Sequence, residues 1–167
     1  QSLPEDPRRL DTLFSPHPEP KEGYRVRQVA LFGLAECARG KKCGELLQTG
    51  DIRGFGELKT LSHNGDRRFR YGADGAEVPV DNTVTDADLT SLIADLASGD
   101  PGRTVRAQIH LQAGGYDCSC EALDRLVDLA NRVDGVVGAG LTGGGLGGCV
   151  LVFVKEEALT RLADALE

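Results

Sequence analysis

The apolar positions of the chain recur mostly at helical spacing. Over residues 24–47 they return every three or four residues, which predicts one long amphipathic helix that Gly40 and Gly44 could bend. Asp51 then stands where an N-cap is expected, and residues 52–61 carry the apolar face of a second helix. The two segments predict an antiparallel helical hairpin.

The next part of the chain changes character twice. Residues 62–76 are polar and contain two turn dipeptides, so we expect a loop. Thr85 and Asp88 form a capping-box pattern ahead of a helix over residues 89–96. Apolar and polar residues then alternate over residues 105–111, which predicts a strand with one buried face.

The C-terminal part alternates between helix and strand patterns. Ser119 is an N-cap candidate for a helix over residues 123–130, and a continuous apolar run at residues 150–154 predicts a buried strand. Residues 156–166 show the periodicity of a final amphipathic helix. This alternation predicts the α+β class, with helices packed on an antiparallel sheet.

The N-terminal part differs from the rest in composition. Most of the seven prolines lie in residues 1–21, so we expect residues 1–23 to be an extended lead-in or interdomain linker. Residues 24–167 are then one domain. A chain of 167 residues with 40% hydrophobic residues is long enough to bury a core of its own.

Charge and cysteine content narrow the function classes. The net charge of −7 disfavours nucleic acid and anionic membranes as partners, because both require a concentrated basic patch. The chain also lacks the run of about 20 apolar residues that a membrane span needs. The five cysteines are odd in number, so reduced thiols in the cytoplasm are expected. Cys118 and Cys120 have no second metal-type pair, so no metal site is predicted.

The segment richest in chemical information is a glycine cluster. Seven of the eleven residues over positions 138–148 are glycine, and such density carries a high cost in backbone entropy. Two interpretations stay open from the pattern alone: a tight turn that leads into a buried strand, or backbone amides exposed to an anion. No Gly-Lys-Ser/Thr follows, so the segment is not a Walker-type loop.

Residues 138–149 resemble the third motif of galactokinases in the GHMP kinase superfamily, Gly-Ala-Arg-Met-Thr-Gly-Gly-Gly-Phe-Gly-Gly-Cys. A second similarity, to the family's Tyr-Glu-Val-Ser-Cys-Pro-Glu-Leu-Asp, is carried by Tyr116, Ser119, Cys120, Leu123 and Asp124. A third lies in Gly50-Asp51, Phe55-Gly56 and Ser62-His63, at the family's helix pair. Together they cover most of residues 24–167.

The chain departs from the family pattern at several positions. Gly140 replaces the motif's arginine, Leu141 its methionine and Leu146 its phenylalanine, while Glu121-Ala122 replaces Pro-Glu. About forty residues, 70–114, also separate two elements that are nearly adjacent in commoner galactokinases. The resemblance therefore implies a GHMP kinase C-terminal-type, ferredoxin-like helix-on-antiparallel-sheet sandwich with an inserted helix and strand.

The resemblance also implies an activity. GHMP kinases of this kind transfer the γ-phosphate of ATP, with Mg²⁺, to a sugar hydroxyl. Their phosphate loop and catalytic Asp lie in an N-terminal lobe whose motifs we do not find in these residues, so we expect no catalytic residue here and little activity from the chain alone. The substrate-proximal candidates are Thr142, Gly143, Gly144, Gly145, Gly147 and Gly148.

Two other interpretations stay open. The first is a non-catalytic sugar- or nucleotide-sensing relative that keeps the fold, and the second is self-association through the face that a missing lobe would cover. Among single residues, Ser119 is interpreted as a helix cap and His63 as a helix-end residue. Asp124 and Asp128 are interpreted as a solvated helix face, and Cys149 as a small packed residue.

Overall fold

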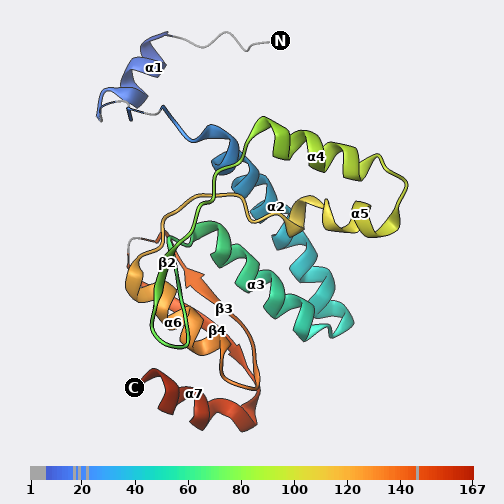
Figure 1. Ribbon diagram of the computed structural model, residues 1–167, viewed down its shortest axis with the longest axis vertical. Helices are drawn as coiled ribbons and strands as arrows, with labels where there is room; N and C mark the ends of the chain where they lie inside the picture. Colours follow the sequence, from blue (N-terminus) through green and yellow to red (C-terminus); the bar gives the residue numbers. More distant parts are fainter. Residues whose placement is uncertain (1–6, 17, 19, 22, 146) are drawn as a thin grey trace.

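The computed structural model describes residues 7–16, 18, 20–21, 23–145 and 147–167. Its largest elements are the helices α2 (Val26–Thr49) and α3 (Ile52–Asp66), which form the predicted hairpin (Figure 1). Gly50 ends α2 in the left-handed conformation with φ 74°, and the Asp51 carboxylate caps α3 by accepting from the backbone N–H of Gly54. Neither Gly40 nor Gly44 interrupts α2.

A strand hairpin packs against α3 of this helix pair. β3 (Val136–Thr142) pairs antiparallel with β4 (Cys149–Val154), with one irregularity between Val136 and Gly138. One face of the hairpin packs on α6 (Glu121–Asn131) and α7 (Leu159–Leu166), which follows a single 3-10 turn, Glu156–Ala158. The core between these elements consists of small and branched residues: Val127, Ala130, Ala139 and Leu162, with Val133, Val136, Val150, Val152 and Val154 packed against them.

The opposite face of the hairpin packs on α3 at very short range. Phe153 of β4 meets Phe55 of α3 edge to face at 4.7 Å. A Cβ atom added at Gly138 would stand 2.6 Å from Gly56 Cα, and closer still to the Gly56 carbonyl. Gly56 and Gly138 are therefore glycines because two backbones touch there.

A second, smaller hairpin is held to α6 by carboxylates. β1 (Phe69–Tyr71) pairs with β2 (Glu77–Pro79), where a loop was expected. The outer N–H groups of Phe69 and Tyr71 donate to Asp124 and Asp128. The interpretation of these two aspartates as a solvated face was wrong, because Asp124 is fully buried and Asp128 also binds the buried Arg67 guanidinium at 2.7 Å.

The predicted α+β class is confirmed. Among the described residues, however, the strands form two separate two-stranded hairpins and not one ferredoxin-like sheet. The reason lies at the free edge of β1, whose N–H groups are satisfied by side chains of α6 and not by another strand.

The insertion contains more helix than predicted. The capping box of Thr85 and Asp88 starts α4 (Asp86–Leu96) as expected. The strand predicted over residues 105–111 was wrong: α5 (Pro101–Arg106) and a 3-10 turn (Ile109–Leu111) occupy this region. Asp100 caps α5 and Pro101 stands at its first position, and these local signals outweigh the short alternation. Figure 1 shows α4 and α5 as an arm on the side away from α7.

The predicted lead-in is not wholly extended. A helix, α1 (Pro7–Phe14), begins with a proline at its first position, where the missing N–H has no helical partner to lose. Residues 1–6, 17, 19 and 22 of the predicted lead-in lie outside the described residues. The domain boundary near residue 23 stays a prediction. In the part of the chain that the structure describes, no helix is long and apolar enough to cross a membrane.

Candidate functional site

The glycine loop, residues 142–148, connects β3 to β4 at the surface of the protein. Thr142, Gly143, Gly144 and Gly148 are exposed, and Gly145 and Gly147 are half-buried. Gly143, Gly145, Gly147 and Gly148 all have φ between 77° and 120°, a region that other residues rarely adopt. Leu146 lies outside the described residues. The six predicted site residues thus lie together, but whether they contact a ligand stays a prediction.

The glycines of residues 138–148 differ in the physical reason for which they lack a side chain. Gly138 and Gly140 lie within β3 and face α3, so their lack of a side chain serves packing. Gly143, Gly144 and Gly147 would meet nothing within 4 Å if they carried a Cβ. Gly145 differs from its loop neighbours, because a Cβ there would stand 2.5 Å from Cys118 Sγ. The cluster therefore combines close packing at Gly138, Gly140 and Gly145 with open backbone at Gly143, Gly144 and Gly147, and the contact with an anion stays a prediction.

A shallow cavity of about 260 Å³ lies beside the glycine loop. Its walls come from α2, α3, the segment before α6 and the end of β3; they include Glu36, Lys59, Ser62, Asp66, Cys118 and Thr142. Phe32 and Tyr116 close one side with their rings stacked at 5.5 Å. The cavity is polar and lined by both signs of charge, as a site for a hydroxylated ligand would be.

The ionisable groups of this cavity are shifted by burial. Burial lowers the pKa of Lys59, and it raises the pKa of Asp66 against the opposing hydrogen bond from Cys118. The Cys118 thiol donates to Asp66 Oδ1 at 3.0 Å, and burial together with this carboxylate raises the thiol pKa to about 12. Cys118 is therefore a protonated, unreactive thiol at neutral pH.

The structure also places two residues at the loop that sequence reasoning did not select. Lys59 Nζ donates to the carbonyl oxygen of Leu141 at 2.5 Å, and the backbone N–H of Leu141 donates to His63 Nδ1 at 3.4 Å. His63 lies in the last turn of α3 as expected, but it is 1% exposed and belongs to the core. Its position in the Ser62-His63 motif was the one signal that could have identified it.

The departure at Gly140 has a structural counterpart. A side chain at position 140 would point at α3, where Lys59 Cε lies 3.1 Å from the place of its first carbon and His63 Cβ lies 3.0 Å away. The arginine of the related motif therefore has no room in this arrangement. The ammonium group of Lys59 lies on this same side of β3, where it donates to the carbonyl oxygen of Leu141.

Two further predictions about single residues were wrong. Ser119 does not cap α6, because the cap position falls on Cys120, while the buried Ser119 donates its backbone N–H to Asp66 O. Cys149 is exposed and does not pack, because it lies at the start of β4 beside the open loop. All five cysteines are free thiols.

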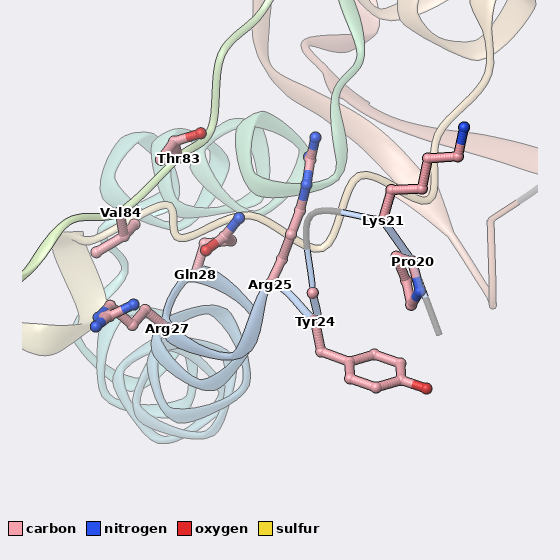
Figure 2. A pocket seen from close by; sticks show the side chains of 9 residues that line it. Pro20, Lys21, Tyr24, Arg25, Arg27, Gln28, Thr83 and Val84 are labelled. Atoms are coloured by element: carbon pink, nitrogen blue, oxygen red, sulfur yellow. The ribbon is translucent and has the colours of Figure 1, made fainter. Parts of the chain in front are cut away.

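A second groove has a volume of about 580 Å³. Figure 2 shows the side chains that line it, among them Lys21, Arg25 and Arg27. Its basic character is mostly neutralised, since Arg25 pairs with Asp117 at 2.6 Å and Arg27 Nη2 bonds Asp86 Oδ2 at 2.9 Å. In the described part of the chain no group of three His, Cys, Asp or Glu residues could hold a metal ion, so a Mg²⁺ bound here would also need oxygens from substrate phosphates or water.

Comparisons with known proteins agree with this architecture. The family model described as GHMP kinases C terminal matches residues 92–167. Galactokinase of Thermotoga maritima is 39% identical over 173 residues, covering 94% of this chain and 47% of the relative. Galactokinase of Canis lupus familiaris is 39% identical over 181 residues, covering 97% of this chain and 43% of the relative.

The human galactokinase is 46% identical over 139 residues, which cover 83% of this chain and 23% of the relative. The chain thus spans less than half the length of these curated relatives. GHMP kinases are a family of phosphotransferases, and the residues that the family model matches include the glycine loop. The chain carries a GHMP kinase C-terminal domain and is homologous to galactokinases over most of its length.

Proposed function

We propose that this chain is the C-terminal lobe of an ATP-dependent sugar kinase, galactokinase-like, which transfers the γ-phosphate of ATP to a sugar hydroxyl. The observation that carries the proposal is the open glycine loop, exposed beside a polar cavity at the end of β3. Backbone N–H groups that no side chain shields can donate to hydroxyl or phosphate oxygens at short range. The names of the relatives supply the substrate class.

The role of these residues in the reaction is positioning. The loop and the cavity would hold the ligand and exclude water from one side, while a second lobe would supply the phosphate loop and the acid. The same proposal assigns Mg²⁺ and the triphosphate to that lobe, together with the phosphate loop. A cytoplasmic location belongs to the same proposal and is supported by five free thiols.

The test is sugar-dependent ADP release by the protein that carries this chain, measured in a coupled assay with Mg-ATP and a panel of aldohexoses that includes galactose. We expect turnover with at least one sugar, and little turnover from residues 1–167 alone. Binding of both ligands without product would instead identify a sensor, and the absence of any sugar effect would refute the proposal.

A further inference from the structure

The penultimate residue of β3, next to the glycine loop, has a backbone that is held at both ends. Leu141 is 5% exposed, and its N–H and C=O are bound by two side chains of α3 that lie one turn apart, His63 and Lys59. A residue whose amide and carbonyl are both fixed sets the direction of the chain that follows it. Residues 142–148 therefore start from a defined orientation.

The bond to Leu141 N–H determines which nitrogen of His63 carries the proton. A neutral imidazole has one donor and one acceptor nitrogen, and Nδ1 is the acceptor here. The proton then belongs on Nε2, which lies 3.2 Å from Asp124 Oδ1. Both side chains are fully buried, and the two atoms are in contact without the geometry of a full hydrogen bond; neither has a hydrogen-bond partner among the residues that the structure describes.

Asp124 is itself held in place. Its second oxygen accepts from the backbone N–H groups of Arg68 at 3.0 Å and Phe69 at 2.9 Å. The carboxylate thus links three parts of the fold: α6, the start of the β1–β2 hairpin and, through His63, the end of β3. Such a carboxylate beside a histidine fixes the ring orientation and the tautomer.

We propose that His63 is a positioning residue for the glycine loop, with its Nε2–H tautomer set by Asp124, so that the pair acts on the reaction through the backbone of Leu141. The positioning of the loop is a property of this chain alone. Its catalytic consequence rests on the proposed function. A histidine that only fills space is the competing interpretation, and it predicts no dependence on which nitrogen is kept.

Two replacements of His63 separate these interpretations. His63→Asn keeps an acceptor oxygen at the place of Nδ1 and loses the group that faces Asp124, whereas His63→Gln keeps a donor at the place of Nε2 and loses the acceptor for Leu141. Both remove part of the ring. Asp128→Asn is a matched control, because Asp128 binds Tyr71 N–H and Arg67 one turn along α6 without touching His63.

The measurements use the protein that carries this chain. Amide hydrogen exchange of the peptide covering residues 141–148 should be about tenfold faster in His63→Gln, the effect of one lost hydrogen bond, and within about threefold of the wild type in the other two variants. Turnover should follow the same order, with kcat for the sugar reduced about tenfold or more in His63→Gln and KM little changed. ¹⁵N NMR of the imidazole should show the Nε2–H tautomer.

An Nδ1–H tautomer in the wild-type protein overturns the proposal without any variant, which covers the case that His63→Gln does not fold. Equal acceleration of loop exchange by His63→Asn and His63→Gln overturns it too, because packing alone would then explain the effect. If the wild-type protein shows no sugar-dependent turnover, the proposed function fails, whereas the tautomer and the exchange order still decide the positioning role.

Discussion

Replacing Gly138 by alanine should separate α3 from β3. The new methyl group would stand 2.6 Å from Gly56 Cα, whereas ordinary contact begins at 3.4 Å, so the two backbones must move apart by about 0.8 Å at the least. Three hydrogen bonds cross the same interface: Ala139 N–H donates to Thr60 Oγ1, Leu141 N–H donates to His63 Nδ1, and Lys59 Nζ donates to the Leu141 carbonyl oxygen. All three lengthen with that movement.

The expected cost combines overpacking with weakened hydrogen bonds. Overpacking a tight interior costs about 1–3 kcal/mol, and each hydrogen bond contributes about 1 kcal/mol net, so we expect Gly138→Ala to lower the free energy of unfolding by roughly 3–5 kcal/mol. For a chain of this size that corresponds to a melting temperature lower by about 6–20 °C.

Matched glycines make the test specific. Gly140→Ala should cost less, because its methyl group would be 2.9 Å from the Lys59 carbonyl and the other neighbours are side-chain atoms. Gly144→Ala, in open space, should change stability by less than about 1 kcal/mol. Urea and thermal unfolding followed by circular dichroism would measure the series. A Gly138→Ala variant as stable as Gly144→Ala would refute the packing argument.

Three further predictions concern other parts of the fold. Leu123→Ala should cost about 2–4 kcal/mol and the exposed Leu159→Ala much less, as measured by urea unfolding; equal losses would contradict the assigned core. Asp51→Ala should remove the cap of α3 and cost about 1 kcal/mol, and no change in the melting temperature would contradict that role. Burial alone would raise the pKa of Asp124, but the contacts with His63 and backbone N–H groups lower it below its usual range. The contribution of Asp124 to stability should therefore be complete above about pH 4 and be lost as the pH falls through the folded-state pKa, so Asp124→Asn should flatten the acid limb of stability against pH; an unchanged limb would contradict this.

The helical hairpin and the starts of α3 and α4 could be predicted from the sequence, because their signals are local. Asp51, Thr85 and Asp88 act within one turn of their own helix, and the residues that satisfy them lie three positions away. The strand predicted over residues 105–111 was wrong because local signals also decide this region. Asp100 and Pro101 start a helix, and they outweigh the short alternation of apolar and polar residues.

Long-range contacts could not be predicted in this way. Asp124 and Asp128 form an ordinary exposed-face pattern on their own helix, and only the N–H groups of β1, more than fifty residues earlier, explain their burial. The location of the glycine loop followed from composition and from the resemblance. The roles of His63 and Lys59 at Leu141 did not, because each joins residues about eighty positions apart.

The central claim is that the backbone of residues 142–148 faces a bound sugar or nucleotide. Amide hydrogen exchange of the protein that carries this chain, with and without galactose plus a non-hydrolysable ATP analogue, tests it most directly. The account predicts that ligands slow exchange in the peptide covering residues 142–148 and leave the tip of the α4–α5 arm, residues 97–100, unchanged. Unaltered exchange in residues 142–148 under conditions where the protein turns over sugar would contradict it.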